Sequence, residues 1–137
     1  MRQALFYILT ITFLITSNSC KKEKASTLSQ AEIRVLNATP WKFYDCYIDP
    51  TQTLSTSLTS NAHNYGDIEV DSTSDYYTFP LLDVYRYSWA RLNMNSQLYY
   101  LLPYDYIGET ALPKGKYTYK ITYLQNFDRL QLELIED

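Results

Sequence analysis

Residues 116–135, KYTYKITYLQNFDRLQLELI, decide the fold of this chain. Apolar or aromatic side chains occupy every second position on both sides of a polar turn: Tyr117, Tyr119, Ile121 and Tyr123, then Leu130, Leu132 and Leu134. A period of two places these side chains on one face of an extended strand. The turn chemistry of Asn126 to Asp128 lies between the two rows, so the stretch predicts a β-hairpin with one buried face.

Further candidate strands precede this hairpin, and none of the chain shows a convincing 3.6-residue stripe. They cover residues 31–37, 41–49, 65–70, 75–79, 83–93 and 97–102. The 137 residues suit a single domain, and fifteen tyrosines with only three glycines favour half-buried pleated surfaces. Seven or eight short strands separated by turn residues predict an all-β, antiparallel two-sheet sandwich.

The N-terminus has the three-part layout of a secretory signal, with Arg2, an apolar run over residues 4–15 and small polar residues up to Cys20. Lys21 and Lys22 end the apolar run before it could span a bilayer. The stretch resembles a bacterial lipoprotein signal, which implies that Cys20 carries the lipid anchor. We therefore expect a signal peptide over 1–19, a lipidated tether over 20–30 and one β-sandwich domain over 31–137. A plain cleaved signal followed by an ordinary cysteine is the alternative.

Two stretches carry a resemblance to a protein family. IRVLNATP (Ile33 to Pro40) and DCYID (Asp45 to Asp49) resemble the opening of an uncharacterised domain found in bacterial secreted proteins. NYGDI, YDYIGE and LPKGKYTYKI, which begin at residues 64, 104 and 112, are similar to stretches in small lipoproteins of Bacteroidota-type envelopes. The resemblance implies an immunoglobulin-like or transthyretin-like sandwich in an outer-membrane lipoprotein, on either face of that membrane, and it carries over no catalytic residue.

Charge and glycine content argue against two classes of partner. Removal of residues 1–19 takes away Arg2 and no acid, so the net charge falls from −3 to −4. Nucleic-acid binding depends on clustered Lys and Arg, and the sequence has no basic stripe. Gly66, Gly108 and Gly115 stand alone, so no glycine-rich loop is available to cradle phosphate. We expect no nucleic acid, no nucleotide and no cofactor.

Candidate chemistry is sparse. Cys46 shares one face of a predicted strand with Tyr44 and Ile48, which predicts a buried core thiol. His63, the single imidazole that could activate a nucleophile, is expected in a polar, loop-like stretch. Asp67, Glu69 and Asp71 have the spacing of one strand face, which predicts a solvated face rather than a metal site. Asp71-Ser72-Thr73 resembles an O-glycan acceptor, with Ser72 as the modified residue. We expect neither a catalytic residue nor a metal ligand.

The tyrosines are the remaining signal. Adjacent tyrosines, as in Tyr76-Tyr77 and Tyr99-Tyr100, must point to opposite faces of a strand, so one of each pair is expected outside the core. Tyr117, just after a turn, is expected to bond back to the backbone and fix a sheet corner. The candidate contact residues for a ligand or partner are Trp41, Tyr104 and Tyr106.

These expectations define two candidate functions. The first is a lipid-anchored, non-catalytic envelope protein that acts as a binding or scaffolding module for another envelope protein. The alternative is a surface protein that captures carbohydrate through a tyrosine-rich patch. Exposed aromatics that flank a groove beside an acid or amide would favour polysaccharide. A flat apolar patch or an open sheet edge would favour a protein partner.

Overall fold

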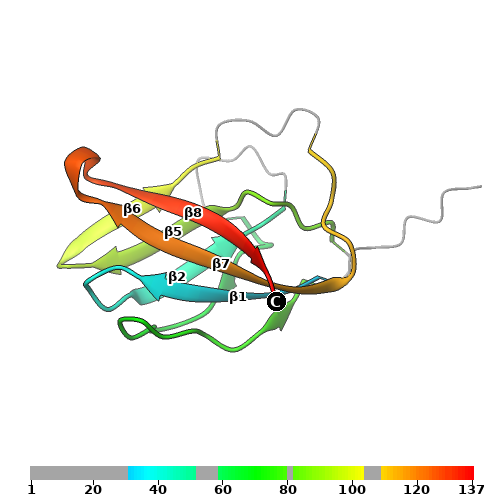
Figure 1. Ribbon diagram of the computed structural model, residues 1–137, viewed down its shortest axis with the longest axis horizontal. Helices are drawn as coiled ribbons and strands as arrows, with labels where there is room; N and C mark the ends of the chain where they lie inside the picture. Colours follow the sequence, from blue (N-terminus) through cyan, green and yellow to red (C-terminus); the bar gives the residue numbers. More distant parts are fainter. Residues whose placement is uncertain (1–30, 52–58, 80–81, 104–108) are drawn as a thin grey trace, which may run out of the picture.

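The computed structural model describes residues 31–51, 59–79, 82–103 and 109–137. Within these ranges eight strands form two four-stranded sheets, with the orders β4-β1-β7-β8 and β3-β2-β5-β6 (Figure 1). The strands are β1 (Ala31–Ala38), β2 (Tyr44–Asp49), β3 (His63–Asn64), β4 (Tyr77–Thr78), β5 (Trp89–Met94), β6 (Gln97–Leu101), β7 (Gly115–Leu124) and β8 (Arg129–Glu136), with a short 3-10 turn, η1 (Gln125–Phe127), before β8. The predicted all-β sandwich is confirmed.

Side chains that alternate along the strands form a shared core between the two sheets. The buried row of β1 is Ala31, Ile33 and Val35, and the row of β5 is Ala90, Leu92 and Met94. Tyr119 and Ile121 of β7 are likewise fully buried in this core. Burying a side chain of this size contributes about 1.5–3 kcal/mol, so the alternating rows supply the main driving force for the fold.

Every strand pair is antiparallel except β1 and β7, which run parallel over eight residue pairs from Ala31↔Gly115 to Ala38↔Thr122. A parallel pair needs a long crossover between its strands. Here the crossover contains the whole second sheet, so the first and last parts of the domain meet at the centre of the first sheet (Figure 1). The predicted hairpin of β7 and β8 is present, with Tyr119 opposite Leu134 and Ile121 opposite Leu132.

The structure corrects two of the expected strands. Residues 65–70 contain only an isolated bridge, Phe43↔Ile68, because Gly66 has a φ of 70° and interrupts the extended backbone. The strand expected over 83–93 begins only at Trp89. The preceding residues bond to loops instead, since Tyr85 N–H donates to Pro50 O at 3.0 Å and Leu112 N–H donates to Val84 O at 2.7 Å.

A bulge in β2 also changes the predicted alternation. Asp45 has a φ of 49°, and the register with β5 shifts between Tyr44 and Tyr47. Phe43 and Cys46 are both buried as a result, whereas Tyr44 and Asp45 are both exposed. The expectation that Tyr44 shares a face with Cys46 was therefore wrong, because the extra residue inverts the alternation on one side of the bulge. Cys46 is in the core as predicted.

Asn37, at the end of β1, explains the IRVLNATP stretch in physical terms. Its amide nitrogen donates to Trp41 O at 2.8 Å and to Ile68 O at 3.1 Å, and its amide oxygen accepts from Thr39 N–H at 3.0 Å. The side chain is completely buried. These bonds hold the turn that carries the chain from the first sheet to the second, and they satisfy backbone groups that would otherwise be buried without partners.

Tyr117 forms the predicted corner. Its hydroxyl donates to Pro113 O at 3.1 Å, across the turn that precedes β7. A Cβ at Gly115 would lie 3.2 Å from the Tyr117 hydroxyl oxygen, so the ring packs directly over this glycine. The missing side chain at Gly115 allows the close approach that the corner needs.

Asn37→Asp tests the turn. The carboxylate would place an oxygen against the carbonyls of Trp41 and Ile68, which need donors, so we expect the free energy of unfolding to fall by about 2–4 kcal/mol in urea titrations. Asn64→Asp is the matched control, because the Asn64 side chain only accepts a bond, from Gly66 N–H at 2.8 Å, and is exposed. Equal losses in the two variants would refute the special role of Asn37.

Candidate functional site

A hollow lies between β6 and β8, which are edge strands of opposite sheets. We call it the β6–β8 groove. Its volume is about 590 Å³, and its apolar floor includes Leu101, Leu130 and Leu132. A sandwich has two such open sides, and side chains fill the space between the sheets only as far as the edge strands allow. The groove is therefore a product of the sheet order.

Aromatic and polar side chains surround this floor. Tyr87 and Tyr100 line the groove and are 40% and 52% exposed. Glu109, Arg129 and Gln131 also line it. Among the described residues, the side chains of Glu109 and Gln131 have no hydrogen-bond or ion-pair partner. The groove thus combines exposed rings with uncommitted polar groups.

A second hollow of about 330 Å³ continues the groove along β8. The two hollows share Tyr87, Gln131 and Leu132, and the second one adds Arg86 and Glu133. Together they follow most of the open edge of β8. The site is an elongated channel rather than a closed cavity.

An apolar surface that adjoins the groove lies on β6 and the residue that follows it. Leu98, Tyr100 and Leu102 are 48%, 52% and 41% exposed, and their spacing of two places them on one side of the strand. The Tyr100 ring lies 6.2 Å from the ring of Trp89, which is buried. We call these three residues the β6 face. A row of large apolar side chains on an edge strand is typical of an interaction surface.

Trp41, the one predicted contact residue within the described ranges, does not line the groove. Trp41 is half-buried, and its ring packs edge-on against Tyr123 at 5.1 Å. Tyr123 and Tyr99 both donate hydrogen bonds to Asp128, at 2.8 and 3.1 Å, and the bond to Asp128 raises the pKa of Tyr123 to about 12. Trp41 therefore belongs to an aromatic cluster that closes one end of the sandwich. Tyr104 and Tyr106 lie outside the described residues.

Each pair of adjacent tyrosines divides between two faces as expected. Tyr100 is exposed on the β6 face, whereas Tyr99 joins the aromatic cluster. Tyr77 stacks on His63, whereas Tyr76 lies on the outer side of the first sheet. The alternation of side chains along a strand was therefore enough to predict that the two tyrosines of each pair lie on different faces.

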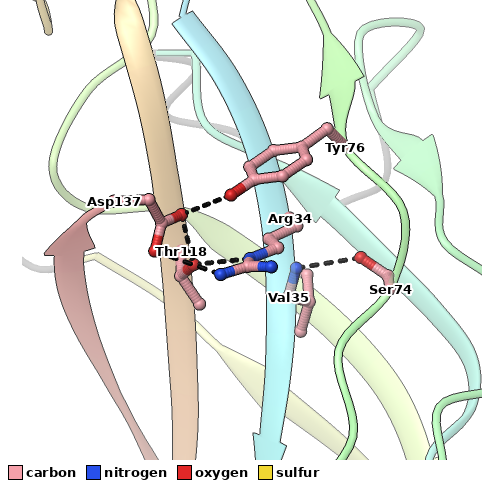
Figure 2. A network of polar contacts seen from close by, with 6 residues as sticks. All are labelled: Arg34, Val35, Ser74, Tyr76, Thr118 and Asp137. Carbon is pink, nitrogen blue, oxygen red and sulfur yellow. Dashed lines mark hydrogen bonds and ion pairs between the residues drawn. The ribbon is translucent and has the colours of Figure 1, made fainter.

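A polar network covers the outer side of the first sheet (Figure 2). Arg34 pairs with Asp137 at 3.2 Å and donates to the Thr118 hydroxyl at 2.8 Å, while the Tyr76 hydroxyl donates to Asp137 at 2.7 Å. Burial tends to raise the pKa of Asp137, but the bonds from Thr118, Tyr76 and Arg34 outweigh it and lower that pKa. The network joins β1, β7 and the residue after β8, so its role is structural.

Cys46 and His63 are both committed to packing. Cys46 is completely buried, and burial raises the pKa of its thiol to about 12, so the reactive thiolate is scarce at neutral pH. The His63 ring stacks on Tyr77 with centroids 3.5 Å apart and contacts the edge of Tyr65 at 4.7 Å. His63 lies in β3 rather than in the loop-like stretch that we expected. Within the described ranges, no three or more His, Cys, Asp or Glu side chains lie close enough together to hold a metal ion.

Two of the three spaced acids bind one lysine. Lys42 Nζ lies 2.7 Å from Glu69 and 3.4 Å from Asp67, and the bond to Glu69 is the main cause that raises the pKa of Lys42. Asp71 instead occupies a turn with a φ of 54°. The expected strand face is therefore present only as an irregular segment beside Phe43. Such exposed ion pairs contribute little to stability, because solvent screens the charges.

The predicted glycan acceptor, Ser72, directly follows Asp71 and lies beside β1. Ser72 is partly exposed, and its hydroxyl donates to Val70 O at 3.3 Å. Its carbonyl accepts a bond from Asn37 N–H at 3.0 Å. O-glycosylation of Ser72 stays a prediction. Cys20 and the expected tether precede the first described residue, and no helix in the described ranges is long and apolar enough to cross a membrane.

Comparison with known proteins agrees on the fold. A solved structure, the NMR structure of a protein from Eubacterium rectale, aligns with a TM-score of 0.54 at 10% sequence identity. The alignment covers 78% of this chain and 89% of the other chain. At this identity the likeness shows the fold alone. The chain matches no family model. No curated protein matches its sequence.

Sequence patterns missed the residues of the groove and the β6 face. Tyr87 lies in a segment that we expected to be a strand, and Arg129 and Gln131 are ordinary polar positions of an amphipathic strand. The available signal was the run of apolar residues over 98–102, which is too continuous for a strand with one solvated face. It could have indicated an edge with an exposed apolar row.

The His63 stack predicts a dependence of stability on pH. Burial lowers the pKa of His63 below its ordinary value of 6.5, so the unfolded chain binds a proton that the folded chain does not. This contribution to stability is fully present above the unfolded-state pKa of about 6.5 and is lost as the pH falls below it toward the lowered pKa of the folded state. His63→Phe keeps an aromatic ring in the stack and removes the proton site. We expect its melting temperature to change less over this range than that of the wild type, and equal changes would contradict the assignment.

Proposed function

We propose that this chain is a lipid-anchored, non-catalytic binding or scaffolding module of the cell envelope, attached to the outer membrane through Cys20. Its partner in this proposal is another envelope protein. The observation that supports it best is the β6 face, with Leu98, Tyr100 and Leu102 exposed on an edge strand. A partner that covers this row removes apolar surface from water at about 25 cal/mol per Å².

The edge position of β6 adds a second means of recognition. Among the described residues, β6 pairs with β5 alone, which leaves its other side available to an added strand. Backbone hydrogen bonds from such a strand give affinity, and pockets for alternate side chains give specificity. The β6 face has both an open backbone edge and alternate apolar side chains.

The direction of the tether fits this role. The described domain begins at Ala31, which pairs with Gly115 at the start of β7. The groove includes Leu124 and Arg129, at the opposite end of the β7–β8 hairpin. At about 3.4 Å per residue, the nine residue steps from Gly115 to Leu124 place these ends about 30 Å apart. An anchored domain would therefore present the groove away from its attachment point.

Capture of carbohydrate is the second candidate function, and a specific observation favours it. The β6–β8 groove has exposed rings at Tyr87 and Tyr100 beside the carboxylate of Glu109 and the amide of Gln131. Sugar rings stack on aromatic surfaces and bond to such polar groups. The groove and the β6 face share Tyr100 and Leu102, whereas Leu98 does not line the groove and Tyr87 and Gln131 are not part of the β6 face, so the two functions can be tested separately.

Leu98→Asp tests the protein partner. A charge in the β6 face should reduce, by at least about tenfold, recovery of a partner cross-linked in intact cells. Val70→Asp is the matched control, since Val70 is 40% exposed on a distant turn. The epitope tag belongs within residues 25–30, because a tag at Asp137 would disturb the network around Arg34. Equal recovery with both variants, or the absence of any stoichiometric partner, would contradict the proposal.

Cys20→Ala tests the anchor. Without the thiol no acyl chain can be attached, so the protein should move from the membrane fraction to the soluble fraction of cell lysates. Cys46→Ala is the control for loss of a thiol elsewhere in the chain, and it should leave the protein in the membrane fraction. Membrane retention of Cys20→Ala would contradict lipid anchoring at this residue.

A further inference from the structure

We propose that the β6–β8 groove binds a short neutral oligosaccharide. This inference rests on the second candidate function, and it names the ligand class and the residues that recognise it. It does not depend on the protein partner, because Leu98 of the β6 face lies outside the groove lining and can be changed separately from Tyr87 and Gln131 of the groove.

The size and shape of the groove suit such a ligand. A volume of about 590 Å³ lies within the usual range of small-molecule sites, about 300–1,000 Å³. The adjoining hollow of about 330 Å³ extends this volume along β8 and shares Tyr87, Gln131 and Leu132 with it. An elongated site with a continuous floor fits a chain of several sugar rings better than a single compact molecule.

The two tyrosines supply surfaces for the apolar faces of sugar rings. Tyr87 belongs to both hollows, so its ring lies where successive units of a chain would pass. Tyr100 of β6 lines the main hollow, and its ring packs against the ring of Trp89, with the centroids 6.2 Å apart. A tyrosine offers a large contact area with little conformational freedom to lose, and it keeps a polar hydroxyl at its end.

The polar groups match hydroxyl-rich ligands. A sugar hydroxyl both donates and accepts, a carboxylate accepts, a guanidinium donates and a carboxamide does both. Glu109, Arg129 and Gln131 bring all three types to one groove. Within the described ranges the Glu109 and Gln131 side chains bond to no other residue, and the Arg129 guanidinium lies over the Phe127 ring at 5.0 Å, with no hydrogen-bond partner for its N–H groups.

The charges of the lining favour a neutral ligand. Arg129 faces the main hollow together with Glu109, and Arg86 faces the adjoining hollow together with Glu133. Among the described lining residues, each hollow therefore has one positive and one negative side chain. Such a site has no net attraction for phosphate or uronate groups, whose binding depends on an excess of positive charge.

Isothermal titration calorimetry tests the inference with four neutral probes: cellotetraose, maltotetraose, laminaritetraose and xylotetraose. The full-length chain is purified in a detergent without a sugar headgroup, so that the detergent cannot occupy the groove. We expect saturable binding of at least one probe, and a loss of at least about tenfold in affinity for Tyr87→Ala and for Gln131→Ala. Tyr44→Ala and Gln125→Ala are matched controls, because both residues are exposed and lie outside both hollows.

Each outcome decides a specific point. Binding that is unchanged in Tyr87→Ala and Gln131→Ala, in variants that melt like the wild type, would place the sugar elsewhere and overturn the proposal. Absence of saturable binding to all four probes would also overturn it. If, in addition, Tyr87→Ala removes the protein cross-linked in cells, the groove belongs to the protein partner. Sugar binding that survives in Leu98→Asp would keep this inference even if the protein partner fails.

Discussion

The parallel pairing of β1 with β7 is the constraint on which the rest of the structure depends. It pairs residues 31–38 with residues 115–122, so each of the other described strands except β8 lies in the crossover between them. These two strands contribute four fully buried side chains to the core: Ile33, Val35, Tyr119 and Ile121. Contacts so distant in sequence form only after much chain entropy has been lost, and the apolar rows must offset that cost.

The sheet order then determines where surfaces for recognition can exist. The sandwich has two sides at which edge strands of the two sheets lie next to each other. β3 lies next to β4 on one side, and β6 lies next to β8 on the other. His63 and Tyr77 stack across the first side and close it, with support from Tyr65, whose hydroxyl donates to Ile33 O at 2.9 Å. The β6–β8 side has no such closing stack among the described residues, and its rings remain exposed. The proposed binding sites lie on this side for that reason.

Sequence patterns predicted regular strands well and irregular backbone poorly. The rows of β1, β7 and β8 follow directly from a period of two, and Tyr117 lies at a corner as its place after a turn indicated. The bulge at Asp45 was invisible, because a positive φ at a non-glycine residue has no strong signal in a single sequence. The groove was invisible too, since Tyr87 and Gln131 are 44 residues apart in the chain and meet only after the sheets pack.

The sequence by itself determined the class of fold, the buried faces of the long strands and the burial of Cys46, because side-chain alternation and turn chemistry are local properties. The tertiary structure alone decided which strands are edges, that β1 and β7 run parallel, and that Trp41 packs inside an aromatic cluster. It also decided that Tyr87, Tyr100, Glu109 and Gln131 line one groove. These features depend on contacts between residues far apart in the chain, for which local patterns carry no information.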